Sequence, residues 1–156
     1  MALIVSRPCE NPTPITRVAS IMKMRRTDKS QAIKVKATLV VCPVSLIAQW
    51  ERELVVKTRP SLKVLVHHGS NRTIDERKFM EYDAVVTAYT TVANEVQEIE
   101  ERCGPLSRVQ WHRVFLDEAH QIKNKRTRMA EGCCRLESDY RWCLTATPIQ
   151  NKIEEL

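Results

Sequence analysis

The chain has 156 residues, of which 43% are hydrophobic and 28% charged, so it can form one globular domain with an ordinary core. This composition excludes a disordered tail. No apolar run approaches the roughly eighteen residues that cross a bilayer, so we expect no membrane partner. The apolar stretch at residues 1–5 is too short for a signal peptide and has no basic residues before it. We therefore expect the protein in the cytosol or the nucleus.

The net charge of +6 and the isoelectric point near 9.1 indicate a polyanionic partner. The basic residues gather in two clusters. Residues 17–36 contain one cluster, opposed only by Asp28, which we interpret as a solvated insertion. The other cluster follows an acidic motif and is either a solvated face or a set of phosphate contacts; it consists of Lys123, Lys125, Arg126 and Arg128.

The six cysteines form no Cys-x-x-Cys pair and no His spacing typical of a zinc site, so we expect reduced thiols. The three glycines are Gly69, Gly104 and Gly132. None of them stands in a Gly-Lys-Ser/Thr or Gly-x-Gly-x-x-Gly context. The sequence therefore contains no complete phosphate-binding loop.

Little regular structure is predicted before residue 38. Residues 1–6 are interpreted as part of a helix. Pro8, Pro12 and Pro14 then break regular structure, and residues 7–37 are predicted to form a basic loop or insertion.

From residue 38 onward, apolar strands alternate with amphipathic helices. Residues 38–42 form a continuous β-prone run, as expected of a strand buried on both faces. Ser45 is then expected to cap a helix that carries Ile47, Trp50 and Leu54 on one face.

The same alternation continues to the end of the chain. Strands are predicted at 63–66, 83–87, 111–116 and 141–144, and helices at 73–80, from about 92 to a stop at 103–105, and around 126–136. This pattern is typical of an α/β fold with a mostly parallel sheet flanked by helices. Ligands of such sheets bind at the carboxyl ends of the strands.

Two adjacent carboxylates, Asp117 and Glu118, follow the predicted strand at 111–116. A carboxylate at such a strand end can hold Mg²⁺ directly or through water, and its neighbour can orient or deprotonate an attacking water. The alternative is a surface acidic pair that caps the short helix that follows.

Four ordered segments resemble motifs of the Swi/Snf-type DNA-dependent ATPases of helicase superfamily two. Residues 39–50, which read Leu-Val-Val-Cys-Pro-Val-Ser-Leu-Ile and then Gln-Trp, are similar to motif Ia. Residues 84–89, Ala-Val-Val-Thr-Ala-Tyr, are similar to motif Ib. Residues 117–124, which begin Asp-Glu-Ala-His, resemble motif II, the Walker B motif. Residues 144–151, Leu-Thr-Ala-Thr-Pro-Ile-Gln-Asn, resemble motif III, but Ala146 stands where glycine is usual.

The resemblance implies a partial RecA-like lobe of the P-loop NTPase type that lacks the P-loop strand. In this interpretation, residues 1–6 are the remnant of the helix after the P-loop, 7–37 are an insertion, and 38–156 are the core with motifs Ia, Ib, II and III. The chain would then be a fragment of the N-terminal ATP-binding lobe. Because the missing strand lies inside the sheet of such lobes, we expect the isolated chain to be marginally stable.

The resemblance also implies ATP and Mg²⁺ as cofactors of the complete protein. Asp117 would bind Mg²⁺, Glu118 would be the catalytic base, and His120 would join the cofactor site and link it to motif III. DNA contacts or couplers would be Ser45, Thr87, Thr145 and Thr147. Structural alternatives exist for residues of these motifs. Ser45 can cap a helix, and Thr87 can end a strand. Trp50 and Tyr89, the aromatic residues of the segments similar to motifs Ia and Ib, can be ordinary core aromatics.

The implied partners are the DNA backbone, contacted largely without sequence preference, and a second ATPase lobe. Residues 67–72 are similar to the helicase-like transcription factor branch, whose members act in postreplication repair in the nucleus. Without the phosphate loop and the arginine finger of the second lobe, the chain alone is expected to be inactive. One alternative is a non-catalytic DNA- or partner-binding module, and another is a metal hydrolase that uses Asp117 with His120 and His112.

Overall fold

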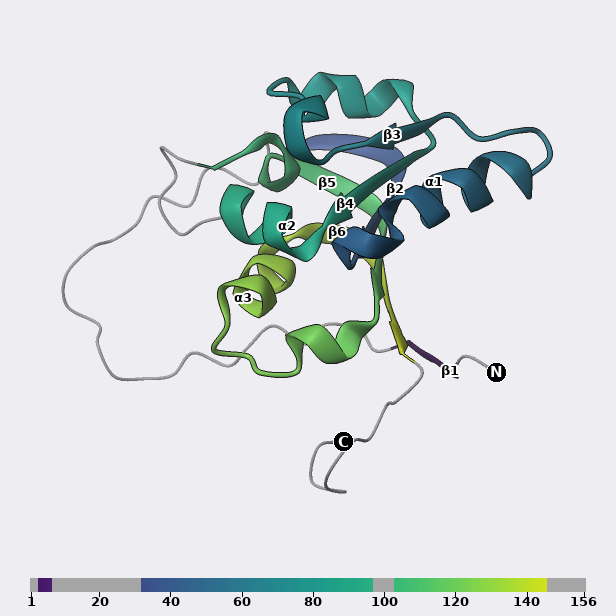
Figure 1. Ribbon diagram of the computed structural model, residues 1–156. Helices are drawn as coiled ribbons and strands as arrows, with labels where there is room; N and C mark the ends of the chain where they lie inside the picture. The colour runs from purple at the N-terminus through teal and green to yellow at the C-terminus, as the bar shows by residue number, and fades with distance from the viewer. Residues whose placement is uncertain (1–2, 7–31, 97–102, 146–156) are drawn as a thin grey trace.

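A computed structural model describes residues 3–6, 32–96 and 103–145, and within these ranges six strands form one sheet (Figure 1). The strand order across the sheet is β1-β6-β5-β2-β4-β3. The strands are β1 (Leu3–Ser6), β2 (Ile33–Cys42), β3 (Val64–Val66), β4 (Ala84–Ala88), β5 (Val109–Asp117) and β6 (Glu137–Thr145). Strands β2 to β6 run parallel to one another, and β1 is antiparallel to β6 at one edge.

Helices cover both faces of this sheet. The helix α1 (Ile47–Val56) packs on one face, and α2 (Tyr89–Glu95) and α3 (Arg128–Arg135) pack on the other (Figure 1). Short 3-10 turns connect these elements: η2 (Val44–Leu46), η3 (Gly69–Asn71), η4 (Glu76–Glu81), η6 (Pro105–Ser107) and η7 (Ala119–Ile122). The expected α/β class is thereby confirmed.

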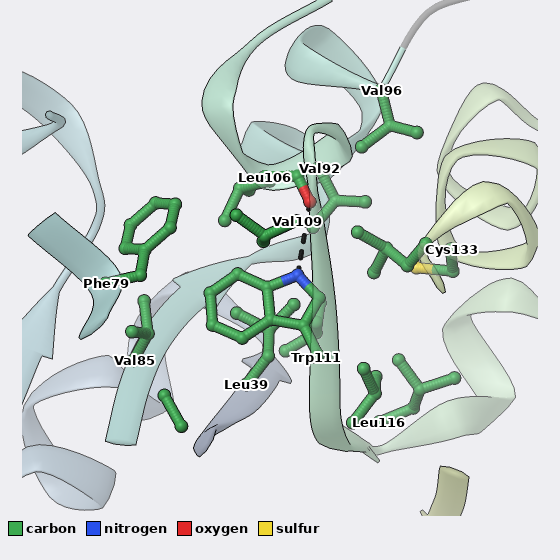
Figure 2. Close-up of a cluster of buried hydrophobic side chains, with 14 of the residues drawn as sticks. Leu39, Phe79, Val85, Val92, Val96, Leu106, Val109, Trp111, Leu116 and Cys133 are labelled. Carbon is green, nitrogen blue, oxygen red and sulfur yellow. Dashed lines mark hydrogen bonds between the residues drawn. The ribbon is translucent and has the colours of Figure 1, made fainter. Parts of the chain in front are cut away.

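The larger apolar core lies between the sheet and the two helices α2 and α3. Trp111 of β5 is fully buried at its centre, and its indole N–H donates to the carbonyl of Leu106 over 3.1 Å (Figure 2). Leu39 of β2, Val92 of α2 and Cys133 of α3 belong to the same cluster. This packing satisfies the single polar atom of a large buried ring, as burial of an indole requires.

A smaller core lies on the opposite face, under α1. Val40 and Cys42 of β2 point toward it, whereas Leu39 and Val41 point toward the larger core. Successive side chains of a strand point to opposite faces of the sheet, so a strand covered on both sides is apolar at every position. This placement between two cores explains why residues 38–42 form a continuous apolar run.

Most predicted elements form within a few residues of their expected bounds. The expected helix at 73–80 forms instead as the 3-10 turn η4, where Asp75 accepts a hydrogen bond from the Arg77 amide over 2.9 Å. The helix expected from about residue 92 to a stop at 103–105 ends at Glu95, and residues 97–102 lie outside the described residues.

The prediction of a helix at residues 1–6 is wrong, because Leu3–Ser6 forms β1. β1 pairs with residues 142–145 of β6 in antiparallel register. Leu, Ile and Val in succession favour a strand, and the outer edge of β6 offers backbone groups that need partners. The backbone groups of residues 142–145 at this edge of the sheet are therefore paired with β1.

The start of the core strand is also earlier than predicted, since β2 begins at Ile33 rather than at residue 38. Between positions 33 and 37, exposed lysines at 34 and 36 alternate with buried Val35 and Ala37. The strand was not predicted here, because the segment was interpreted as part of a basic insertion and the period-2 pattern of its lysines was not recognised. The β2–β5 register shifts between Val35 and Thr38, which marks a bulge at this point. Residues 7–31 of the predicted insertion lie outside the described residues.

Candidate functional site

The carboxyl ends of the parallel strands lie along one side of the sheet, the carboxyl edge, and bring together the residues at these ends. Cys42, at the end of β2, is the register partner of Ala88, at the end of β4. Asp117, at the end of β5, is the partner of Leu144, one residue before the end of β6. The structure therefore places the four motif-bearing strand ends next to one another, as predicted for a parallel sheet.

Asp117 is held by three neighbours at this edge. One carboxylate oxygen, Oδ2, accepts a hydrogen bond from the indole N–H of Trp50 over 2.7 Å. The other oxygen, Oδ1, accepts from the amide of Glu118 over 2.9 Å. The main-chain carbonyl of Asp117 accepts from the hydroxyl of Tyr89 over 2.7 Å. Both the carboxylate and the backbone of Asp117 are thus fixed by donors.

Glu118 adopts a left-handed backbone conformation, with φ 49° and ψ 48°, and it is the only non-glycine residue in the described ranges with a positive φ. Backbone strain of this kind, in a residue other than glycine, is concentrated at functional sites. The carboxylate of Glu118 makes no capping hydrogen bond to η7 and instead lies 3.1 Å from Nδ1 of His120. The alternative of an acidic helix cap is therefore not the arrangement found.

Sequence reasoning placed Trp50 and Tyr89 in the segments similar to motifs Ia and Ib, with ordinary core aromatics as the alternative, and missed their contacts with Asp117. Both residues lie inside the two segments that resemble DNA-contact motifs, which was the only signal available in the sequence. Burial raises the pKa of the Tyr89 phenol above its usual range, and nearby thiols and Asp117 add to this effect. The phenol therefore stays protonated and remains a donor at neutral pH.

The predicted DNA contacts lie in different environments. Ser45 is exposed within η2 and does not cap α1, whose N-cap is Leu46 without a side-chain hydrogen bond. The capping prediction is therefore wrong, because the turn closed by the Leu46 amide and the Pro43 carbonyl places Ser45 before the cap position. The hydroxyl of Ser45 is left accessible to an external group.

Thr87 is completely buried, and its hydroxyl donates to the carbonyl of His67 over 2.8 Å. A direct contact with a DNA phosphate is not available to this side chain, so only its role as a coupler stays a prediction. Thr145 is half-buried at the end of β6, and Thr147 lies outside the described residues.

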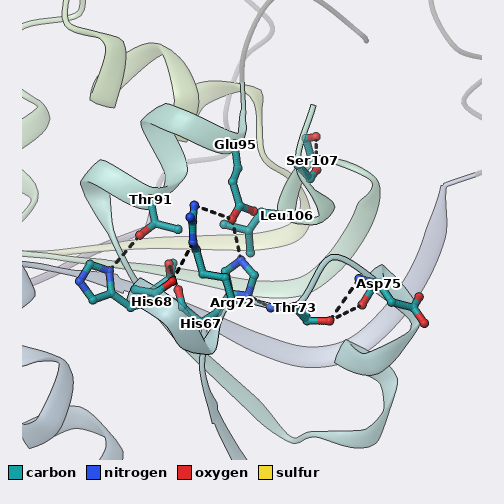
Figure 3. A network of polar contacts seen from close by, with 12 residues as sticks. His67, His68, Arg72, Thr73, Asp75, Thr91, Glu95, Leu106 and Ser107 are labelled. Carbon is teal, nitrogen blue, oxygen red and sulfur yellow. Dashed lines mark hydrogen bonds and ion pairs between the residues drawn. The ribbon is translucent and has the colours of Figure 1, made fainter. Parts of the chain in front are cut away.

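A buried polar network stabilises the neighbouring end of β3 (Figure 3). His67 is fully buried, and its Nε2 lies 2.9 Å from Oε1 of Glu95 on α2. Arg72 approaches the same oxygen at 3.7 Å, and the next histidine, His68, lies 3.0 Å from the hydroxyl of Thr91. The network joins the loop after β3 to α2 at the edge that carries Asp117.

No group of three or more His, Cys, Asp or Glu side chains in the described part of the chain is arranged to hold a metal ion. His112, a ligand in the metal-hydrolase alternative, instead lies 3.5 Å from Asp139. This arrangement does not support a metal hydrolase. Mg²⁺ differs from a resident transition metal, because it is commonly bound through one or two carboxylates together with waters and substrate phosphates. The fixed carboxylate of Asp117 fits that requirement.

The second basic cluster lies between η7 and the first turn of α3, and its members are all exposed: Lys123, Lys125, Arg126 and Arg128. Thr127 lies within this segment and caps α3 by accepting a hydrogen bond from the Ala130 amide over 3.2 Å. The cap fixes the chain direction where the cluster meets the helix. Across the described ranges, no helix has both the length and the apolar character needed to cross a membrane.

The five-stranded parallel arrangement, with an Asp-Glu pair at the end of β5, is that of an α/β protein with a RecA-like fold. The family model of the SNF2-related domain matches residues 13–156. The chain therefore belongs to the SNF2-related domain family. Its described fold matches that of the Sulfolobus solfataricus SWI2/SNF2 ATPase core in complex with dsDNA, with a TM-score of 0.63 and 34% identity over 78% of this chain and 24% of that one.

Curated relatives come from the same family branch that the sequence suggested. Helicase-like transcription factor CHR27 of Arabidopsis thaliana is 39% identical over 76% of this chain, and DNA repair protein RAD5B of the same plant is 36% identical over 100% of it. Transcription termination factor 2 of Drosophila melanogaster is 47% identical over 74% of the chain. The chain spans 16%, 13% and 11% of the length of these three relatives, respectively.

Proposed function

We propose that the chain supplies the Walker B carboxylates and part of the DNA-contact surface of a nuclear, DNA-dependent ATPase of the SNF2 family. The observation that carries this proposal is the fixed carboxylate of Asp117, with the strained Glu118 beside it at the carboxyl edge of the sheet. Membership in the SNF2-related family and the likeness to an ATPase core bound to DNA support it.

Each acidic residue has a separate task in this proposal. Asp117 is the magnesium ligand, and its two hydrogen bonds keep the carboxylate in one orientation. When bound, Mg²⁺ neutralises charge on the β and γ phosphates of ATP. Glu118 orients and deprotonates the attacking water, and His120, 3.1 Å from its carboxylate, sets the direction of that carboxylate.

The DNA contacts are proposed to be phosphate contacts without sequence preference. Ser45 is exposed at the strand-end edge, and the four basic residues that follow η7 are exposed as well. Lysine and arginine contacts of this kind release counterions, so binding to duplex DNA should weaken steeply as salt increases. The structural relative bound to dsDNA supports this partner class.

Turnover is proposed to require parts that this sequence does not contain. None of its three glycines forms a phosphate-binding loop, so the β and γ phosphates lack backbone amides to hold them. A second ATPase lobe with an arginine finger would stabilise the transition-state charge. The chain by itself is therefore expected to release phosphate from ATP no faster than a Glu118→Gln control.

The deciding experiment uses the complete protein with Glu118→Gln as the variant. We expect DNA-stimulated ATP hydrolysis to fall by about 10² to 10⁴-fold while the affinity for ATP stays within twofold. Glu131→Gln, on the exposed side of α3, is the matched control and should retain full activity. Equal loss of nucleotide binding and turnover would refute the assigned role of Glu118.

A non-catalytic DNA-binding module remains the second candidate, favoured by the absence of a phosphate loop and by the net charge of +6. The two functions differ in the same assay. If neither protein hydrolyses ATP although both bind duplex DNA, the non-catalytic module is the correct interpretation. If the Glu118→Gln protein hydrolyses ATP as fast as the wild type, the protein is an ATPase and the assigned role of Glu118 is wrong.

A further inference from the structure

Trp50 contacts Asp117 across 67 residues of sequence, and both partners belong to well-packed elements. The indole ring of Trp50 packs against the apolar cluster under α1, whose buried members include Val40 of β2 and Ile47 of α1. Packing on this side restricts the rotation of the ring. The N–H group of the indole is therefore presented to Oδ2 of Asp117 by a side chain that has little freedom to move.

The two donors on Asp117 divide its oxygens between them. The indole of Trp50 takes one lone pair of Oδ2, and the amide of Glu118 takes one lone pair of Oδ1. Each oxygen keeps a further lone pair, because a carboxylate offers about four acceptor positions. An indole N–H only donates and carries no charge, so it cannot compete for the metal or neutralise the carboxylate.

We propose that Trp50 is a positioning residue for magnesium binding, whose indole N–H holds the Asp117 carboxylate in the orientation that presents its free lone pairs to the ion. This inference rests on the proposed function, since it requires Asp117 to be the magnesium ligand. Partners of this kind orient metal-binding groups, and their removal commonly lowers metal affinity by about 10- to 100-fold.

The test measures the binding of Mn²⁺, a paramagnetic stand-in for Mg²⁺, to the complete protein in the presence of a non-hydrolysable ATP analogue. Electron paramagnetic resonance of the free ion gives the affinity. The variants are Trp50→Phe, which keeps an apolar ring but removes the donor, and Trp142→Phe as a matched control. Trp142 lies on β6 and stacks on Phe115 at 4.7 Å between ring centroids. We expect Mn²⁺ affinity to fall about tenfold in Trp50→Phe and to stay unchanged in Trp142→Phe.

A second measurement uses the 156-residue chain, and its first part needs no substitution. The chain has three tryptophans, so nitrogen-15 labelling gives three indole N–H resonances for assignment. We expect Mn²⁺ to broaden the Trp50 resonance before those of Trp111 and Trp142. In metal-free protein, Asp117→Asn should shift the Trp50 resonance alone, because its acceptor loses its charge.

The outcomes separate this inference from the proposed function. Failure of the complete protein to bind Mn²⁺ together with the ATP analogue would refute the metal role of Asp117 and the inference with it. Mn²⁺ binding that Asp117→Asn abolishes but that Trp50→Phe leaves unchanged would refute the role of Trp50 and leave the proposed function intact. An unshifted Trp50 resonance in Asp117→Asn would refute the inference in the same way.

Discussion

The hydroxyl of Tyr89 donates a hydrogen bond of 2.7 Å to the main-chain carbonyl of Asp117. Tyr89 is the first residue of α2 and follows directly after β4, whereas Asp117 ends β5, and β2 lies between these two strands in the sheet. The bond therefore ties together two strand ends that are not neighbours. Only 2% of the Tyr89 surface is exposed, so water cannot replace the donor easily.

Tyr89→Phe should lower the free energy of unfolding by about 1 kcal/mol, because it removes this hydrogen bond and leaves the ring packing intact. Urea unfolding monitored by circular dichroism measures the change. Tyr140→Phe is the control, since 55% of Tyr140 is exposed and its loss should cost less than about 0.5 kcal/mol. Equal effects of the two substitutions would show that the contact with Asp117 contributes nothing.

Gly104→Ala should destabilise the fold by about 1 to 3 kcal/mol through overpacking. A Cβ atom at position 104 would lie 2.6 Å from Cβ of Glu95, which is too close for any real contact, and the Gly104 amide is already bonded to the Glu95 carbonyl over 2.7 Å. Gly132→Ala is a milder comparison, because the nearest atom there is 3.2 Å away. The melting temperature of Gly104→Ala should lie well below that of Gly132→Ala. The reverse order would contradict the close approach between position 104 and Glu95.

Glu95→Ala should lower the free energy of unfolding by about 2 kcal/mol or more, because Nε2 of fully buried His67 would lose its partner. The same side chain already leaves Oε2 buried without a hydrogen-bond partner, so the network around it is tightly enclosed. Chemical denaturation gives the change. Glu76→Ala removes a half-exposed pair with Arg108 at 3.5 Å and should cost less than about 1 kcal/mol.

The fold should lose stability at alkaline pH through Cys133. Burial raises the pKa of this thiol to about 12 from 9.0, although Arg141 opposes the shift. Between these values the unfolded chain has released the proton that the folded chain keeps, so the free energy of unfolding falls as pH rises. The slope is about 1.4 kcal/mol per pH unit.

Cys133→Ala should remove this contribution to the pH dependence of unfolding between about pH 9 and 12, and urea titrations across that range measure it. Cys134→Ala, at the exposed neighbouring position, should leave the slope nearly unchanged. A slope that is the same in the Cys133→Ala protein and in the wild type would contradict the shifted pKa.

The sequence alone was sufficient for the α/β class and for the strand ends that carry the candidate site. Residues 38–42 are apolar at nearly every position, which indicates a strand covered on both faces, and Asp117 follows the strand predicted at 111–116. These signals are local, because the periodicity of a strand or helix is written in neighbouring residues. The same local reasoning was wrong for residues 1–6 and 33–37, where β1 and the start of β2 depend on distant partner strands.

Only the tertiary structure decided what surrounds Asp117. The contacts of Asp117 with Trp50 and Tyr89 join positions that are 67 and 28 residues apart. The structure also showed that Thr87 is buried while Ser45 is exposed. No pattern of neighbouring residues encodes which indole or phenol meets which carboxylate. That pairing depends on the strand order of the sheet and on the face that each helix covers, and both arise when the whole core packs.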